Sequence, residues 1–340
     1  MTKKYVPTKN LAELDLNSEL TEFESNLRSK RDQAISVADY RSERGEVVAA
    51  LLEAVASEVG DEECSAYAER LKKCADKNNF YYGEDFLDNS TGELFSGFGN
   101  LFGCGLKLCQ SCVARQAARN RNIARQAVNN TKLLNREHYC YLRDDYIIEQ
   151  EKYRFVTLTM PEVKASLKKT MMIQKRAWDL FRKLKFFKNY FAGHIKSVEF
   201  TFRLNGTYHT HSHLLAITFF IPEELIKLHW TNCVEKAFNE FGIEFEAEQA
   251  NVNLKLPDSL EDVIKELCKY ITKTTTWEQI PASHLLEIAQ IRRWDRMFEV
   301  GGRFRQTIQK LNAERSAFSS SAGIEDSLKE DKKSSSSYYL

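Results

Sequence analysis

The stretch IKSVEFTFRLNGTYHTHSHLLAITFF, residues 195–220, decides the fold. It holds two runs rich in β-branched and aromatic residues, Ile195–Arg203 and His209–Phe220. Between them stands Asn205-Gly206, a pair typical of tight turns between antiparallel strands. The stretch therefore predicts a long β-hairpin, and its apolar end LLAITFF indicates that the second strand is buried in a sheet.

The length of the turn decides which side chains meet across this hairpin. A strict two-residue loop would place Glu199 opposite Ser212. A three-residue loop with Gly206 in the left-handed conformation places Glu199 opposite His211 instead. We expect the three-residue loop, and a register that moved Glu199 away from His211 would remove it as a metal ligand.

Three of the seven histidines, His209, His211 and His213, alternate on the second strand. The two-residue period of a strand points all three to one face. Imidazole nitrogens gathered on a buried face favour a divalent metal, and the Glu199 carboxylate offers a hard oxygen ligand. The alternative is an exposed polar sheet face, which the apolar end of the strand disfavours.

The periodicity of the other segments predicts further strands and helices, and together they indicate an α+β fold. We expect strands at 153–160, ended by Pro161, and within 247–256. We expect helices within 10–73, from about 113 to 136, after Pro161 to about Asn189, over 223–240, and over 259–274, where Ser259 is the expected N-cap.

The helix predicted over 259–274 carries a second group of polar side chains. Tyr270 lies at the edge of its apolar stripe, with Glu266 one turn earlier and Lys273 almost one turn later. A tyrosine in this position commonly serves packing alone. A functional role for Tyr270, Glu266 and Lys273 therefore depends on which other chemical groups lie near them.

Three thiols, Cys104, Cys109 and Cys112, occur within nine residues of a loop-rich segment. Such a segment buries little core and is stabilised most by a structural zinc ion, which takes four ligands. We expect Cys74 to be the fourth, with Cys64 and Cys140 as alternatives. Buried free thiols without metal remain the competing interpretation.

The 340 residues suggest about two domains, and 49 basic against 48 acidic residues give a net charge of +1. That balance argues against a histone-like binder, yet it hides a gradient. Residues 10–63 hold fourteen acidic and five basic residues, 107–136 hold seven basic and no acidic residues, and 161–196 hold ten basic and two acidic residues. The basic stretches indicate a polyanion-binding surface, or else solvated helix faces.

No apolar run is long enough to span a membrane, and the first residues lack the apolar core of a signal peptide. We therefore expect a cytoplasmic protein with reduced cysteines.

Taken together and in order, these motifs resemble those of the HUH endonucleases, and most closely the single-tyrosine class of rolling-circle plasmid replication initiators. The resemblance covers about residues 74–310 and leaves the acidic first 70 residues out. The matching positions are the F-x-T-L-T strand (Phe155, Thr157, Leu158, Thr159), the H-x-H-x-H-x-L strand (His209, His211, His213, Leu215), E-x-x-K-Y-x-x-K (Glu266, Lys269, Tyr270, Lys273), the C-x4-C-x2-C cluster, and GGRFR at 301–305. Two departures are Thr210 and Gln110, where the family commonly has proline.

The resemblance implies a central antiparallel sheet with helices on one side, after a helical, zinc-stapled N-terminal region. Composition and the resemblance together predict four segments. Composition gives an acidic helical region (1–73) and a disordered Ser-rich tail (313–340), and the resemblance gives a cysteine-rich zinc module with a basic helix (74–140) and an HUH endonuclease domain (150–312).

It also implies an activity, in which Tyr270 nicks one strand at the plasmid origin and leaves a 5′-phosphotyrosyl link and a 3′-OH primer. Mg²⁺ or Mn²⁺ would sit on His211, His213 and Glu199, with His209 ranked last as a ligand. Glu266 would activate water for the terminating cut, and Lys269 and Lys273 would hold phosphate oxygens.

The implied partners are the double-stranded origin, the single-stranded nick site, and a host helicase, single-strand-binding protein and polymerase. Six basic residues are candidates for binding DNA: Arg115, Arg119, Arg121, Arg125, Lys183 and Lys185. Aromatic residues near the last two, at 186, 187, 190 and 191, would stack bases or belong to the core.

Three other functions compete with this one. A conjugative relaxase or a transposase would share the chemistry, although relaxases usually place the tyrosine before the histidines. A zinc-stapled DNA-binding regulator would use none of it. A hydrolytic metalloenzyme unrelated to DNA would show no salt-dependent DNA affinity.

Overall fold

The computed structural model describes residues 36, 39, 41–57, 60, 62–76, 79–82, 86–87, 94–95, 98–100, 102–140, 143–203, 205–268, 281–291 and 297–321. The chain divides into two compact units, residues 1–111 and 112–340. The predicted segment 74–140 spans this division. Within the described residues no helix has the length and apolar character needed to cross a membrane.

The first unit is helical and then loop-rich, as predicted. Residues 41–57 form a helix, and α2 follows over Glu62–Ala75. Short strands come next: β1 (Phe80–Tyr82) pairs with β4 (Phe98–Asn100), and β2 (Phe86–Leu87) pairs with β3 (Leu94–Phe95). The rest of the predicted acidic region, including residues 1–35, lies outside the described residues.

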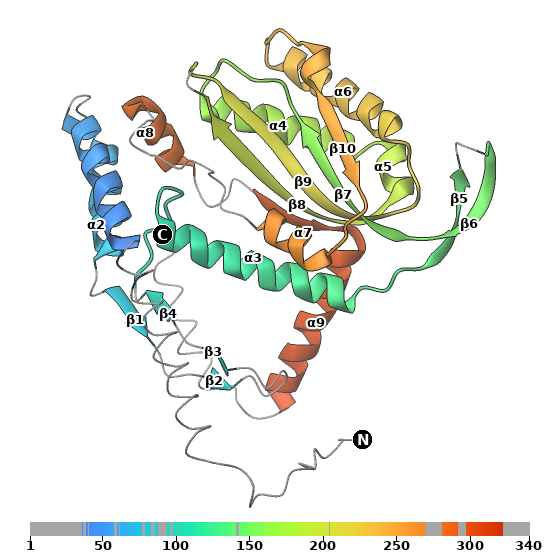
Figure 1. Ribbon diagram of the computed structural model, residues 1–340, viewed down its shortest axis with the longest axis horizontal. Coiled ribbons are helices and arrows are strands. Elements are labelled where there is room, and N and C mark those ends of the chain that lie inside the picture. Colours follow the sequence, from blue (N-terminus) through green and yellow to red (C-terminus); the bar gives the residue numbers. More distant parts are fainter. Residues whose placement is uncertain are drawn as a thin grey trace, which may run out of the picture. The chain divides into compact units, whose positions relative to one another are not determined.

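The second unit is built on a five-stranded antiparallel sheet of order β10-β7-β9-β8-β11 (Figure 1). The long strands are β7 (Lys152–Thr159), β8 (Phe191–Phe202) and β9 (Tyr208–Thr218). The edge strands are β10 (Asn251–Lys255) and β11 (Phe298–Gly301). The first four match the predicted strands, and β11 is an addition to them.

Helices account for most of the remaining chain in this unit. They are α3 (Gln110–Asn130), α4 (Leu167–Phe181), α5 (Lys185–Tyr190), α6 (Glu223–Glu240), α7 (Leu260–Leu267), α8 (Ala282–Gln290) and α9 (Gly302–Ser321), with a 3₁₀ turn, η2, at Ala247–Gln249. The expected single helix after Pro161 is thus two, separated by a turn after Phe181. The tail predicted to be disordered from 313 is helical to Ser321, because α9 meets no glycine or proline in that stretch; residues 322–340 lie outside the described residues.

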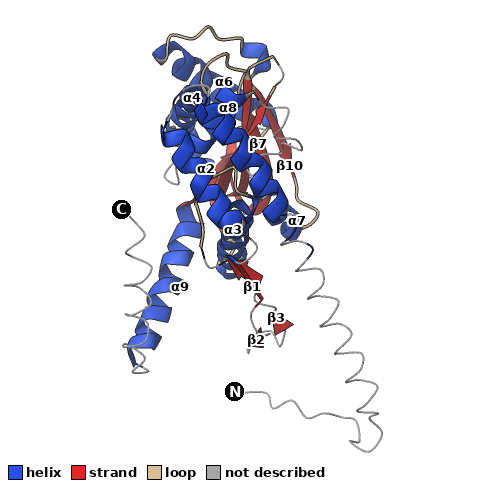
Figure 2. Cartoon of the chain, turned by 90° about the vertical axis from the view of Figure 1, so that its left-hand side faces the viewer, coloured by secondary structure: helices blue, strands red, loops and turns tan. Residues whose placement is uncertain are grey.

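Helices cover both faces of the sheet, so the expectation of helices on one side is wrong (Figure 1 and Figure 2). On one face α4, α5 and α6 pack on even-numbered residues of β9 such as Leu214. On the other face α3, α7 and α9 pack on odd-numbered residues, Leu215 and Ile217. These two side chains follow His213 on its own face and are fully buried, which requires an apolar cover there.

Between α3 and β7 the chain forms a two-stranded ribbon that the sequence did not predict, β5 (Asn135–Cys140) with β6 (Asp145–Gln150). Figure 1 shows it projecting beyond the end of the sheet. It is attached there by His138, whose ring stacks on Phe219 at 4.0 Å between centroids. Its charged, weakly alternating sequence explains why periodicity missed it.

The two glycines of the GGRFR segment have a packing role. A Cβ on Gly301 would lie 2.1 Å from the ring of His194. Gly302 has φ of +57°, and a Cβ there would lie 2.5 Å from the carbonyl oxygen of Ala192. Only glycine allows β11 and α9 to approach β8 this closely.

Candidate active site

The hairpin of β8 and β9 has the predicted three-residue loop. The Arg203 N–H donates to the Thr207 carbonyl at 2.9 Å, and Gly206 has φ of +80°. In the resulting register Glu199 lies opposite His211. The register prediction is confirmed, and with it the side of the sheet to which Glu199 belongs.

Glu199, His211 and His213 form a compact group. The Nε2 atoms of His211 and His213 each lie 3.0 Å from the same carboxylate oxygen, Oε2 of Glu199. The three ligand atoms lie within 4.8 Å of one another, and all three side chains are largely buried. Two nitrogens and one oxygen that converge in this way are a fitting donor set for a divalent cation. The mixture suits Mn²⁺ at least as well as Mg²⁺.

His209 lies on the same face, one strand position further out. Its ring centroid is 5.4 Å from that of His211, yet it does not belong to the group of converging ligand atoms. Burial, with the neighbouring His211, lowers the pKa of His209 below its ordinary value. His209 thus shares a strand face with His211 and His213 but does not share their contact with Glu199.

The strand β7 supports this group from the other side of β9. Thr157 lies opposite His213, and its Oγ1 is 3.2 Å from Nδ1 of that ring. Phe155 stacks parallel to the same ring at 5.6 Å between centroids. One nitrogen of His213 is therefore engaged by Thr157 while the other points to Glu199, an arrangement that fixes the orientation of a metal-ligating histidine. The contact of Thr157 with His213 could not be predicted from the sequence, because the pairing of β7 with β9 is not local.

The polar residues between the histidines are satisfied on the opposite face. Gln174 of α4 donates to the Ser212 hydroxyl at 2.7 Å and accepts from the Thr210 hydroxyl at 3.3 Å. Both hydroxyl residues are fully buried. Because a buried polar group without a partner is costly, these bonds favour the strand orientation that leaves the histidines on the other face.

The helix α7 covers the face that carries the ligand group. Val263, Ile264 and Leu267 are buried there, and the Ser259 side chain caps the helix by accepting from Asp262 N–H, as predicted. Glu266 lies on this helix, half-buried. The helix was predicted to continue to 274, but α7 ends at Leu267 with Cys268 as its C-cap. Lys269, Tyr270 and Lys273 lie outside the described residues.

The four cysteines chosen from the sequence come together. The sulfur atoms of Cys74, Cys104, Cys109 and Cys112 lie within 4.8 Å of one another, and those of Cys74 and Cys109 are 3.4 Å apart. The alternative Cys64 donates its thiol to the Leu52 carbonyl instead. Four buried thiols at this spacing form the closed set that structural zinc requires.

The basic residues expected to bind DNA have different surroundings. Arg115 and Arg119 are exposed on α3, and Arg121 is half-buried. Arg125 is exposed but forms a two-pronged ion pair with Glu261 of α7, whose hydrogen bonds lower the pKa of Glu261. The arginines of α3 therefore lie on a helix that covers the same face of the sheet as the ligand group.

Lys183, in the turn between α4 and α5, and Lys185, the first residue of α5, are exposed, and both helices cover the opposite face of the sheet. The aromatic residues beside them, Phe186, Phe187, Tyr190 and Phe191, are between 4% and 7% exposed and belong to the core. The suggestion that they stack bases is wrong, because their rings pack on α4, α6 and each other.

Comparison with known proteins identifies the family. The family model described as replication protein matches residues 100–340, which include the sheet, the ligand group and three of the four clustered cysteines. Neither a curated protein nor a solved structure matches the chain. The match disfavours a relaxase or a transposase. On this match and the motif order, the chain belongs to the replication protein family and is a rolling-circle plasmid replication initiator.

Proposed function

We propose that this initiator nicks one DNA strand at the plasmid origin, with Tyr270 as nucleophile and a divalent cation held by Glu199, His211 and His213. The observation that carries the proposal is the shared face: the ligand group lies on the side of the sheet that α7 covers. Tyr270 follows the last residue of α7, Leu267, by three positions, a span of at most about 11 Å.

In the proposed step the Tyr270 phenolic oxygen forms a bond to phosphorus while the bond from phosphorus to the 3′-oxygen breaks. The phenolic proton is lost and the departing 3′-oxygen gains one, so the products are a 5′-phosphotyrosyl ester and a free 3′-OH. No other reactant is consumed, and the ester keeps the strand available for rejoining. A bound Mn²⁺ or Mg²⁺ would polarise the scissile phosphate and stabilise its developing charge.

Other residues take supporting roles in this proposal. Glu266 serves as general base for the water that ends the cycle, because a single tyrosine leaves the second cut to another nucleophile. Lys269 and Lys273 hold phosphate oxygens or lower the pKa of the phenol. Arg115, Arg119, Arg121 and Arg125 contact the DNA backbone, with a weaker contribution from Lys183 and Lys185 on the opposite face.

The remaining parts of the chain fit the same proposal. Zinc on Cys74, Cys104, Cys109 and Cys112 stiffens the loop-rich module (74–140) that helps to bind the double-stranded origin. The endonuclease domain spans 150–312. A host helicase, single-strand-binding protein and polymerase then act on the nicked plasmid in the cytoplasm.

The test is covalent capture of the DNA. The protein is incubated with Mn²⁺ and single-stranded origin DNA, and mass spectrometry of the DNA-linked peptide is expected to name Tyr270 and the attached nucleotide. Tyr270→Phe should bind DNA and form no link, whereas Tyr146→Phe, a change at an exposed tyrosine of the β5–β6 ribbon, should form it normally. Absence of any adduct with the unaltered protein would favour a non-catalytic regulator.

A further inference from the structure

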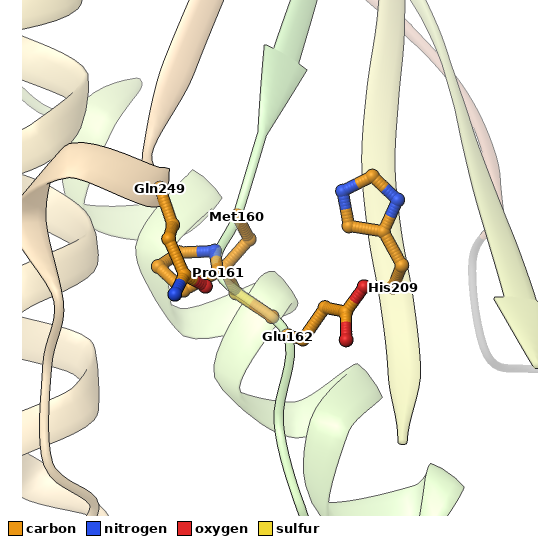
Figure 3. Close-up of a pocket in the computed structure, with 5 residues that line it drawn as sticks. All are labelled: Met160, Pro161, Glu162, His209 and Gln249. Carbon is orange, nitrogen blue, oxygen red and sulfur yellow. The ribbon is translucent and has the colours of Figure 1, made fainter. Parts of the chain in front are cut away.

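A cavity of about 350 Å³ lies where β7 ends, and the proposed nicking step does not use it. Figure 3 shows the five residues that line it, contributed by β9, by η2 and by the segment that follows β7. They are Met160, Pro161, Glu162, His209 and Gln249. The volume is ample for a single planar base and too small for a folded element.

The cavity adjoins the ligand group. His209, on its wall, precedes His211 by two residues on the same face of β9, and their ring centroids are 5.4 Å apart. Two residues advance a strand by about 6.7 Å. A group bound in the cavity is therefore a near neighbour of whatever the Glu199 group holds.

Two polar groups of the lining, Glu162 and Gln249, offer oxygen atoms that accept hydrogen bonds. The Glu162 carboxylate is held by the Thr207 hydroxyl, which donates to it at 2.9 Å, and lies 3.3 Å from Nε of Arg203. Each carboxylate oxygen keeps a further lone pair for a ligand. One N–H of the Gln249 amide donates to Glu246, and the amide carbonyl is available to accept from a ligand.

This chemistry selects the base of a nucleotide over its phosphate. A carboxylate in the wall repels a phosphate, whereas it accepts readily from an exocyclic amino group such as N4 of cytosine. The half-buried His209 ring offers an aromatic surface on which a base can lie.

We propose that this cavity is a specificity pocket for one amino-bearing nucleobase next to the scissile phosphate. The inference rests on the proposed function, since it assumes a single strand lying across the ligand group. Cytosine and adenine meet the acceptors of Glu162 and Gln249 with an amino group, and thymine lacks one.

The test measures binding without chemistry. Fluorescence anisotropy without added Mn²⁺ or Mg²⁺ compares a thymidine oligomer of about 15 nucleotides with the same oligomer carrying one central cytosine or adenine. The unaltered protein should bind the substituted oligomers about fivefold more tightly. Glu162→Gln and Gln249→Ala should reduce that ratio to near one, and Glu248→Gln, which removes a neighbouring exposed charge outside the cavity, should keep it.

A ratio near one for the unaltered protein would overturn the pocket, as would an unchanged ratio in both variants. Gln249 is exposed, so Gln249→Ala is expected to fold normally. This variant keeps the test valid even if Glu162→Gln destabilises the fold by weakening the hydrogen bond from Thr207. Thermal unfolding monitors the stability of both variants. The binding test and the adduct experiment distinguish the two proposals. A tyrosyl adduct without base preference refutes the pocket alone, and base preference without an adduct refutes the nicking chemistry alone.

Discussion

Two carboxylate–imidazole groups lie on opposite faces of the same sheet, and they differ in what meets the carboxylate. On one face Glu199 receives Nε2 of His211 and of His213. Both nitrogens are of a type that can ligate a metal, because imidazole offers a lone pair.

On the other face Glu299 meets three different nitrogens. His194 Nε2 lies at 3.4 Å, Lys196 Nζ at 3.8 Å and the indole N–H of Trp178 at 3.3 Å. Lys196 is itself buried and lies over the Trp178 ring at 4.8 Å. An ammonium and an indole N–H can only donate, so this group carries its own cation.

The difference separates a ligand site from a structural ion pair. Burial alone would raise the pKa of Glu299, but the hydrogen bond with His194 and the charge of Lys196 outweigh it and lower the pKa to about 2. Burial in turn lowers the pKa of Lys196 to about 8. One group therefore ties β11 to β8, and the other offers converging ligands.

The largest expected effect comes from the same substitution made in each of the two groups. Glu199→Gln should abolish Mn²⁺ binding and slow formation of the tyrosyl adduct by at least about 10³-fold, because the anionic ligand is lost. Glu299→Gln, the same change on the opposite face, should leave both intact. Calorimetric Mn²⁺ titration and single-turnover adduct formation measure the two quantities, and equal losses in both variants would refute the distinction.

A smaller effect should follow from the support of His213. Thr157→Val removes the hydroxyl at Nδ1 while keeping the shape, so Mn²⁺ affinity should fall by about 10- to 100-fold. Thr157→Ser, which retains the hydroxyl, should restore most of the affinity. The same titration measures it. Equal affinities in the valine and serine variants would show that the hydroxyl does not position the ring.

The Glu299 group should make the free energy of unfolding depend on pH in the acid range. A carboxyl whose pKa is depressed by folding stabilises the protein above its ordinary pKa of 4.5, and this contribution is lost as pH falls towards 2. The loss should amount to about 3 kcal/mol. Urea unfolding of the unaltered protein and of Glu299→Gln should differ most near pH 7 and converge near pH 2; a constant difference would contradict the linkage.

The smallest expected effect concerns the loop that sets the register of Glu199. Gly206→Ala forces a side chain into φ of +80° and should lower the free energy of unfolding by about 1 kcal/mol. Gly206→Asn should cost less, because asparagine tolerates the left-handed region. Chemical denaturation measures both, and equal stabilities would show that the loop relaxes without strain.

Much of the candidate site could be predicted because its determinants are local. The turn at Asn205-Gly206 and the two-residue period of β9 decide which residue faces His211. The grouping of Cys74 with the three later thiols was also predicted, although Cys74 lies 30 residues before Cys104 and its choice depended on counting ligands rather than on spacing.

Other features could not be predicted, since they arise where distant segments meet. The cover of α3 over the ligand face, the ribbon of β5 and β6, and the pairing of β11 with β8 all depend on contacts between residues far apart in sequence. The aromatic residues 186–191 were open to two interpretations until the core that surrounds them was known.

By itself the sequence determined the chemistry: which ligand types occur, on which face of their strand they lie, and, through one glycine, which carboxylate joins them. Only the tertiary structure decided what surrounds that chemistry, namely Thr157 behind His213, the acceptor-lined cavity beside His209, and the ion pair that occupies the opposite face. The reason is physical, because turn geometry and strand alternation act between neighbours along the chain. Packing and hydrogen bonding act between whichever segments the fold brings together.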